Sequence, residues 1–309
     1  MNVIATGLGF LEGPVICQDG SLVVTSLDLG QVFRITLHEV THGTRGEISR
    51  DGPVYDPPSQ HPAGVARVLA TTGGGANGAT EGPNGNIYVT QNGGTWPAIN
   101  AVRSAPGVQV IEPDGAVNIF GTEMQSPNDL CFGPDGYLYV TDPARKPERD
   151  YGRIWRCDIR TRECETLIVC DWYPNGIGFS SDPHWIYVAD SRGDRIVRFP
   201  LSDIRPATLE TAIQLNHGKP DGFAFDAHGD LVIACPDLGP QGGDIQVYRG
   251  NTLQRALKPG TSKYYTNLAI SADGWLYLCD ADRGQVLAER WGCAGLPLYP
   301  FRSSPGVAS

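Results

Sequence analysis

The sequence predicts an all-β fold, a six-bladed β-propeller made of four-stranded blades. A pattern of one polar residue, an alternating apolar run, a turn and a second run of β-forming residues occurs six times in 309 residues. The copies begin 46 to 65 residues apart, close to the roughly 40–50 residues that a four-stranded blade takes. The 39 Gly and 24 Pro residues indicate many turns. Six copies in register count against a β-sandwich with accidental internal similarity.

Each copy supplies the first two strands of one blade. The six segments are 11–26, 76–91, 127–142, 174–190, 220–235 and 266–280. Five of them have Asp-Gly, Asn-Gly or His-Gly between the two runs, at residues 19–20, 84–85, 135–136, 228–229 and 273–274. These dipeptides predict hairpins, because glycine tolerates a positive φ. The fourth copy has a longer turn at residues 181–184.

Third and fourth strands are expected to follow. Third strands are predicted at 30–37, 107–113, 152–159, 194–201, 243–250 and 284–290. Fourth strands are predicted at 66–72, 116–122, 165–171, 210–216 and, weakly, 253–258. The sixth copy has no fourth strand after it, so residues 2–7 are expected to pair with 284–290 and close the ring, which hides the sheet edges. No linker divides the chain, and residues 1–309 are expected to form a single propeller domain.

Composition and charge exclude several classes of partner. There are 24 Lys and Arg against 34 Asp and Glu, a net charge of −10, which argues against nucleic acid and an anionic membrane surface. No apolar run approaches the roughly 18 residues of a membrane span. The N-terminus lacks the parts of a signal peptide, so a cytoplasmic location is expected. The eight Cys are therefore expected to be thiols. Cys157 and Cys164 could face each other across a hairpin, but are interpreted as ordinary strand residues.

The polar residue that leads each copy points to a metal site. The first strand of a four-stranded blade lines the central channel, so the six lead residues are expected to meet at one mouth. They are Glu12, Asn77, Asn128, Asn175, Asp221 and Asn267. Asn and Asp also serve as turn residues at strand entries, but buried carboxylates without a cation are costly. An all-oxygen set predicts one divalent cation, calcium first. Manganese, magnesium and zinc are alternatives, although zinc normally takes His or Cys.

With these motifs the chain resembles, over nearly its whole length, the senescence-marker-protein (regucalcin)/gluconolactonase/luciferin-regenerating-enzyme family of six-bladed propellers. The resemblance rests on the motifs Leu11-Glu12-Gly13-Pro14, Pro127-Asn128-Asp129, Pro174-Asn175-Gly176-Ile177 and Pro220-Asp221-Gly222. It implies a lactone-hydrolysing enzyme in which Glu12, Asn175 and Asp221 are metal ligands. Asn128 would be a fourth ligand or a substrate contact, and Asp221 would also be the general base.

The substrate is expected to be less polar than an aldonolactone. Family members that act on sugar lactones tend to carry an Arg two residues before the residue that matches Asn128, where this chain has Ser126. A partly aromatic mouth also suits a less polar substrate, and it is expected from Phe10, Trp172, Tyr173, Tyr264 and Tyr265. The alternative source of the missing guanidinium is Arg103 or Arg145. The candidate substrate contacts are Asn77, Trp96, Arg103, Ser126, Asn128, Trp172, Tyr173 and Asn267.

Loops are expected to shape the two mouths. Residues 91–106 and 142–151 connect second and third strands on the mouth that holds the lead residues, and are expected to act as lids. The basic residues of the second loop, Arg145, Lys146 and Arg149, are interpreted as a solvated turn. His217, four residues before Asp221, is an alternative base, although a lone His is more often a structural hydrogen-bonding group. The insert 38–66 is expected on the opposite mouth, as an interface or a decoration.

Two classes of function remain open. In the first, the metal polarises the carbonyl of a small lactone or ester and Asp221 activates water. Diisopropyl fluorophosphatase, a related metal-dependent propeller, extends this chemistry to phosphorus esters. In the second class the protein is a non-catalytic scaffold in which calcium ties the blades together. An ion held by about four protein oxygens keeps positions open for substrate, whereas one held by six or seven is closed.

Overall fold

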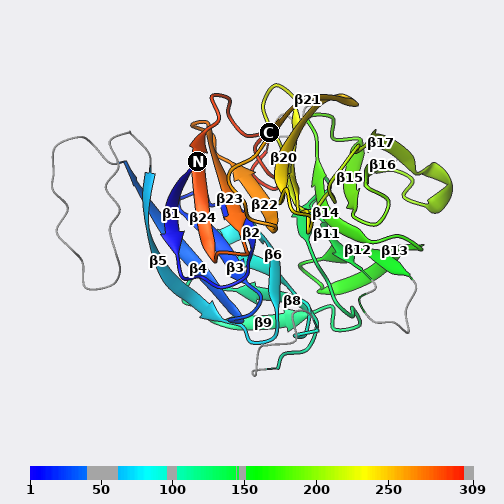
Figure 1. The fold of residues 1–309 in the computed structure, drawn as a ribbon. Coiled ribbons are helices and arrows are strands. Elements are labelled where there is room, and N and C mark those ends of the chain that lie inside the picture. The colour runs from blue at the N-terminus through cyan, green and yellow to red at the C-terminus, as the bar shows by residue number, and fades with distance from the viewer. Residues whose placement is uncertain (40–61, 96–102, 144, 146–150, 303–309) are drawn as a thin grey trace.

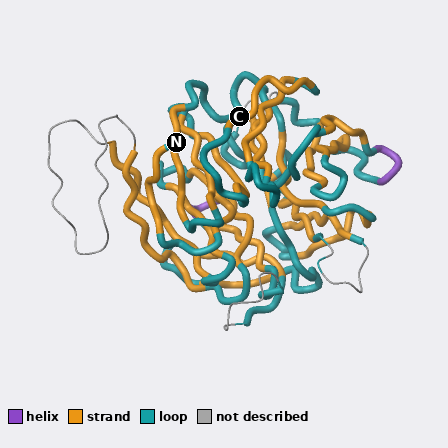
Figure 2. The backbone as a smooth tube through the Cα atoms, in the orientation of Figure 1, coloured by secondary structure: helices purple, strands orange, loops and turns teal. Residues whose placement is uncertain are grey.

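Six four-stranded antiparallel sheets are arranged around a centre, which confirms the predicted six-bladed β-propeller (Figure 1). The computed structural model describes residues 1–39, 62–95, 103–143, 145 and 151–302. Figure 2 shows strands joined by loops over nearly all of this part. The two helices in it are three-residue 3-10 turns, Pro83–Gly85 and Pro206–Thr208. No helix among these residues has the length and apolar character needed to cross a membrane.

The first three blades follow one another along the chain. The first blade contains β2 (Leu11–Ile16), β3 (Leu22–Ser26), β4 (Gln31–Glu39) and β5 (Pro62–Thr71). The second contains β6 (Ala76–Glu81), β7 (Ile87–Gln91), β8 (Gly107–Ile111) and β9 (Val117–Phe120). The third contains β10 (Leu130–Phe132), β11 (Leu138–Asp142), β12 (Gly152–Asp158) and β13 (Glu163–Cys170).

The last three blades repeat this order, and the sixth takes its outer strand from the N-terminus. The fourth blade contains β14 (Pro174–Phe179), β15 (Trp185–Asp190), β16 (Arg195–Pro200) and β17 (Glu210–Gln214). The fifth contains β18 (Phe223–Phe225), β19 (Leu231–Cys235), β20 (Asp244–Arg249) and β21 (Thr252–Leu257). The sixth contains β22 (Tyr265–Ile270), β23 (Trp275–Asp280), β24 (Gln285–Arg290) and β1 (Asn2–Thr6).

Pairing of β1 with β24 closes the ring as expected. The register places Asn2 opposite Ala288 and Thr6 opposite Gln285. The N-terminal ammonium of Met1 lies 3.3 Å from a carboxylate oxygen of Glu289. Ile4 is buried in the apolar cluster that joins the sixth blade to the first. The first strand of the chain is therefore held by main-chain pairing, charge and apolar packing together.

Apolar side chains between neighbouring blades form the core. Each strand alternates its side chains between two faces, and the faces of adjacent sheets pack against each other. Between the third and fourth blades, for example, Ile154 and Ile168 belong to one buried cluster with Ile177 and Val188. This packing fixes the blades as a ring, so the entry of each first strand is held at a defined place.

Two expectations need correction. Strand β4 continues to Glu39 and strand β5 already begins at Pro62, so the two strands include both ends of the predicted insert 38–66. Residues 40–61 lie outside the described residues. Cys157 and Cys164 form a disulfide, contrary to the expectation of eight thiols. The two residues are directly opposite each other in the β12–β13 register. Disulfides persist mainly in oxidising compartments, so the cysteines do not support the expected cytoplasmic location, which stays a prediction.

Candidate metal centre and active site

The first strands of all six blades line the central channel, as predicted. Residues that follow the lead positions, together with the lead residue Asn267, border a single cavity of about 930 Å³. They belong to the ranges 13–18, 79–81, 129–132, 177–179, 223–225 and 267–271. The segment 295–299, which follows β24, also borders this cavity. The lead residues lie at the inner end of these ranges, where the six strands begin.

Irregular pairing at the strand entries turns the lead side chains out of the regular ladder. The register shifts next to four of them, between Glu12 and Val15, Ala76 and Ala79, Pro174 and Ile177, and Tyr265 and Leu268. In the third and fifth blades, β10 and β18 begin only two residues after Asn128 and Asp221. Such bulges re-aim a side chain where a sheet ends, and here they do so beside the channel.

Hydrogen bonds from one blade to the next fix the backbone at the lead positions. The Thr141 hydroxyl donates to the carbonyl oxygen of Asn175 at 2.7 Å, and the hydroxyl of Thr25 donates to that of Asn77. Across the closure of the ring, the Thr266 hydroxyl donates to the carbonyl oxygen of Leu11 at 2.8 Å. A threonine side chain in one blade thus holds the backbone of the next blade, either at its lead residue or at the residue just before it.

Four of the lead residues are followed by a glycine, because the neighbouring blade approaches too closely for a Cβ at these positions. A Cβ at residue 222 would lie 2.0 Å from Cγ of Asn267, and one at residue 13 would lie 2.4 Å from the carbonyl oxygen of Asn77. In the third blade the corresponding position is Asp129, whose carboxylate oxygen would lie 2.3 Å from a Cβ at residue 78. The third blade therefore adds a carboxylate to the channel where four other blades have glycine.

Three carboxyl groups share the channel, and burial raises the pKa of each. Burial is the main cause for Glu12, and the neighbouring Asp221 and Asp129 raise its pKa further. Burial and then Asp129 raise the pKa of Asp221. Burial raises the pKa of Asp129 to about 7, although the backbone N–H groups of Leu130 and Ile177 and the Asn267 side chain donate hydrogen bonds to it. Such a cluster is stable at neutral pH only with protons or a cation.

The predicted ligand Asn175 and the predicted substrate contact Asn77 both have side-chain oxygens available as acceptors. The Asn175 Nδ2 donates to Ser191 Oγ at 3.0 Å, and the Asn175 side chain also hydrogen-bonds to Asp221. This leaves Oδ1 of Asn175 as an acceptor. The Oδ1 of Asn77 is buried and has no hydrogen-bond partner among the described residues. A buried acceptor of this kind fits a cation or a polar group of a substrate.

The remaining predicted lead residues, Asn128 and Asn267, are buried as well. Asn267 is engaged within the protein, because its Oδ1 accepts from the Leu268 N–H at 2.8 Å and its side chain also hydrogen-bonds to Asp129. Its structural role is to hold Asp129 in the channel. The structure thus joins Glu12, Asn175, Asp221 and Asn267 to one carboxylate cluster, and adds Asp129, which the sequence reasoning missed.

Arg145 is not the solvated residue that its loop predicts. It is partly buried, and its positive charge lowers the pKa of both Glu12 and Asp221. Its guanidinium also hydrogen-bonds to Tyr173. Lys146 and Arg149, and most of the predicted lid 142–151, lie outside the described residues. One guanidinium therefore reaches the carboxylate cluster from the lid side of the channel.

A second pocket, of about 320 Å³, places Arg145 near Ser126. Both residues line it, together with Asp142, Tyr151 and Arg153. The Ser126 hydroxyl lies 2.8 Å from that of Thr95, and its backbone N–H donates to Asp142 Oδ1 at 2.8 Å. The pocket consists of residues from an entry loop and a loop between second and third strands. It therefore lies on the lead side of the carboxylates, whereas the 930 Å³ cavity lies on the far side.

The aromatic residues expected at the mouth lie in several environments. Trp172 is 8% exposed and belongs to the core between the third and fourth blades, and Tyr265 is fully buried. Phe10 and Tyr264 pack edge to face, with ring centroids 5.5 Å apart. Arg103 is exposed and donates to the carbonyl oxygen of Gly94 at 3.1 Å. Trp96 and much of the predicted lid 91–106 lie outside the described residues.

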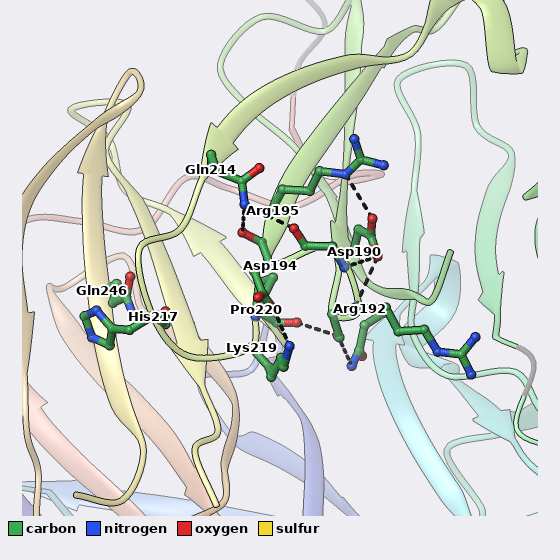
Figure 3. A network of polar contacts seen from close by, with 12 residues as sticks. Asp190, Arg192, Asp194, Arg195, Gln214, His217, Lys219, Pro220 and Gln246 are labelled. Atoms are coloured by element: carbon green, nitrogen blue, oxygen red, sulfur yellow. Dashed lines mark hydrogen bonds and ion pairs between the residues drawn. The ribbon is translucent and has the colours of Figure 1, made fainter. Parts of the chain in front are cut away.

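His217, the alternative base, is held by another partner. Its Nε2 hydrogen-bonds to Asp244 Oδ2 at 2.7 Å. In Figure 3 His217 lies beside Gln246, while Lys219 reaches Asp194 of the neighbouring blade, at 2.5 Å. The carbonyl oxygen of Pro220, next to Lys219, accepts from the Ser191 hydroxyl at 2.6 Å. The local contacts of His217 are typical of a structural histidine.

The sequence model of the family described as "SMP-30/Gluconolactonase/LRE-like region" matches residues 10–282. The chain is 26% identical to a gluconolactonase of Zymomonas mobilis, over 81% of this chain and 72% of that protein. It is 24% identical to the adipocyte plasma membrane-associated protein of Gallus gallus, over 75% of this chain and 55% of that protein.

Solved structures with the same fold include proteins of lower identity. A gluconolactonase from Xanthomonas campestris superimposes with a TM-score of 0.65 at 20% identity, covering 95% of this chain and 89% of that one. The calcium-binding protein regucalcin from Agrobacterium tumefaciens superimposes with a TM-score of 0.66 at 18% identity, covering 97% of each chain. At these identities the likeness establishes the propeller fold.

Proposed function

The chain belongs to the SMP-30/Gluconolactonase/LRE-like family, and from this premise we propose that it is a lactonase that depends on one divalent cation, calcium first. The observation that carries the proposal is the buried cluster of Glu12, Asp129 and Asp221 in the channel, in which burial raises the pKa of all three carboxyl groups. The names of the Zymomonas and Xanthomonas relatives support lactone hydrolysis, and that of the Agrobacterium protein supports calcium.

The donor atoms present fit a hard cation. Glu12, Asn175 and Asp221 would hold it, with Asn128 as a fourth ligand or a substrate contact. Carboxylate and amide oxygens are the ligands that calcium, magnesium and manganese prefer. About four protein oxygens would leave positions open for substrate, which favours an enzyme over a closed structural site. When bound, the cation supplies Lewis-acid polarisation of the ester carbonyl and acidifies water.

Asp221 is the residue that would move the proton. Its carboxylate accepts a proton from water as the water oxygen attacks the carbonyl carbon of the lactone. The bond between that carbon and the ring oxygen then breaks, and the ring oxygen takes the proton from Asp221, which yields a hydroxy acid. Opposite charge lowers the pKa of a carboxyl group. Arg145 offsets the effect of burial only in part, since the pKa of Asp221 is still raised to about 8, so a bound cation would be what keeps Asp221 ionised at neutral pH.

The pocket lined by Ser126 and Arg145 is where we place the substrate. The expectation of a less polar lactone rested on Ser126 and on an aromatic mouth. Arg145 now supplies a guanidinium in the same pocket, and Trp172 and Tyr265 are buried in the core. A lactone with hydroxyl substituents therefore fits better than an alkyl lactone, because a guanidinium pairs with oxygen atoms.

Two alternatives remain testable, a phosphorus-ester hydrolase and a calcium-bound scaffold. Metal-stripped protein would be assayed on gluconolactone, an alkyl lactone and diisopropyl fluorophosphate, each with calcium, manganese, magnesium, zinc or no metal. Lactone hydrolysis that requires added metal, fastest on gluconolactone, is expected. Turnover of the phosphorus ester alone would favour the first alternative. Metal binding without turnover of any of these substrates would favour the scaffold.

Asp221→Asn tests the proposed base. The variant keeps an oxygen ligand but loses basicity, so kcat at saturating metal is expected to fall at least ~100-fold, within the usual worth of general-base catalysis. Metal occupancy is measured in the same sample. Asp244→Asn is the matched control, because Asp244 is a buried carboxylate of the same blade that binds His217, and it should retain activity. Full recovery of Asp221→Asn once metal is restored would reduce Asp221 to a ligand.

A further inference from the structure

A second group of metal-ligating side chains lies at the hairpin turn of the fifth blade. Asp226, His228 and Cys293 each offer one donor atom within 4.8 Å of the other two. Asp226 and His228 belong to the turn between β18 and β19, whereas Cys293 comes from the segment after β24. The three donors are an oxygen, a nitrogen and a sulfur, unlike the all-oxygen set of the channel.

Hydrogen bonds hold the carboxylate of Asp226 in place. Its Oδ1 accepts from the backbone N–H groups of His228 and Asp230, both at 3.0 Å. Its Oδ2 accepts from Trp291 Nε1 at 3.2 Å. The residue is 4% exposed, so these bonds fix the carboxylate. Ligating carboxylates are commonly held by outer hydrogen bonds of this kind.

Backbone hydrogen bonds hold Cys293 over the same turn. The N–H of Ala227 donates to the carbonyl oxygen of Ala294 at 2.8 Å, and that of Leu296 donates to Phe225 at 2.9 Å. The N–H of Gly295 donates to Ser271 at 2.9 Å. Cys293 itself is a free thiol and partly exposed. The loop is thus preorganised, and the thiol is accessible from solvent.

We propose that Asp226, His228 and Cys293 bind a zinc-class transition metal ion. Sulfur, imidazole and carboxylate together select zinc among the common divalent cations. Zinc bonds of about 2.0–2.3 Å require the three donors to close in, and the exposed imidazole of His228 is free to turn for this. The Cys293 thiol loses its proton to solvent on binding, and water fills the fourth position. The ion joins the segment after β24 to the fifth blade.

This site would stabilise one wall of the channel. The segment that Cys293 opens continues into residues 295–299, which border the 930 Å³ cavity. A metal bond from Cys293 to Asp226 and His228 adds a link between the sixth and fifth blades that does not depend on the channel cation. The two sites also differ in preference, since sulfur and nitrogen donors favour zinc and all-oxygen donors favour calcium.

Cobalt(II) is the probe that separates the two sites. A thiolate ligand gives cobalt a near-ultraviolet charge-transfer band, which an all-oxygen site does not. Titration of metal-stripped, full-length protein is expected to produce this band with one equivalent of cobalt, and zinc should displace it. Absence of the band at stoichiometric cobalt would overturn the proposal.

Variants assign the band to these residues. Cys293→Ser should abolish it, and His228→Ala should weaken cobalt binding at least ~10-fold. His184→Ala is the matched control, because His184 is exposed in the corresponding turn of the fourth blade and its N–H donates to Asp182 at 3.0 Å. The band should survive in this control and in Glu12→Gln. A band unchanged in Cys293→Ser would come from another thiol and would refute the assignment. Zinc should also slow alkylation of Cys293 in the wild type, and alkylation at an unchanged rate would count equally against it.

Discussion

At the scale of the residue, the chemistry of the channel depends on how its three carboxyl groups are neutralised. Burial raises the pKa of Glu12, Asp129 and Asp221. Asp129 raises the pKa of the other two further, and Arg145 lowers the pKa of Glu12 and Asp221. Arg145 is the one cation of the described part of the chain that acts on Glu12 and Asp221, and one guanidinium cannot balance three carboxylates. Removing one carboxylate should therefore weaken cation binding. In metal-free protein the same removal should relieve repulsion and lessen the loss of stability at neutral pH.

The first residue prediction concerns Glu12. Glu12→Gln removes a full negative ligand charge but keeps an oxygen, so calcium affinity should fall more than ~100-fold, beyond the loss that outer hydrogen-bond partners cause. Titration calorimetry of metal-stripped protein measures this. Glu81→Gln is the control, since Glu81 is also buried on a first strand but accepts from Gln18 N–H at the far end of it. Equal affinities of wild type and Glu12→Gln would contradict the assignment.

The second concerns Asp129 in metal-free protein. Its pKa is raised from 3.8 to about 7, so the folded state binds more protons than the unfolded state between these values. The free energy of unfolding should therefore fall as pH rises from about 4 to about 7. In Asp129→Asn this fall should be smaller, as urea titrations at several pH values would show. Parallel pH profiles of wild type and variant would refute the prediction.

The lead residues could be predicted from the sequence, because the repeat places them at equivalent positions and the ring brings these together. Asp129 could have been found too, since it stands where four blades have glycine. Arg145 was named only as an alternative guanidinium for the substrate. Its place beside the carboxylates could not be predicted, because its loop has no repeat to compare with and its side chain reaches the channel only through folding. The burial of Trp172 likewise depends on packing between two blades, which a single strand pattern does not contain.

At the scale of the element, the hairpin of β12 and β13 has a feature that its residue types alone left open. Alternating strand residues predicted both strands, and the pairing places Cys157 opposite Cys164. Register between two strands is set by the length of the turn and by the buried face, neither of which a cysteine count contains. The expectation of thiols came from the N-terminus of the chain, which carries no information about this hairpin.

The disulfide can be counted directly. Thiol titration of protein denatured without reductant should give six reactive groups, from Cys17, Cys131, Cys170, Cys235, Cys279 and Cys293. After reduction the same assay should give eight. Cys164→Ser provides the control, because it frees Cys157 and should give seven without any reductant. Eight groups in the unreduced wild type would show that the hairpin carries two thiols.

At the scale of the whole molecule, the ring is held by one strand from the opposite end of the sequence. β1 completes the sixth blade, and without it β24 would be an edge strand beside the first blade. An exposed edge pairs readily with other chains. The pairing of β1 with β24 could be predicted, because the sequence has a fourth strand after each of the first five copies and none after the sixth.

Deleting residues 1–7 should abolish soluble folded protein. The deletion removes the β1–β24 pairing and the buried Ile4, and it exposes the edge of β24. Solubility and thermal unfolding of the truncated chain measure the effect. Two substitutions separate pairing from packing: Ile4→Asp should destabilise strongly, whereas Val3→Asp, at a residue 39% exposed, should not. An unchanged melting temperature after the truncation would remove the closure argument.

The position of β1 also determines when the protein can finish folding during its synthesis. Residues 2–6 leave the ribosome long before their partners at 285–288 are made, because five blades lie between them in the sequence. Contacts so far apart in sequence form slowly, and blades one to five can pack before the sixth exists. Until then β1 is an unpaired strand on a growing chain. A chaperone that covers short apolar strands would therefore have its main task at β1, until residues 285–288 have been made.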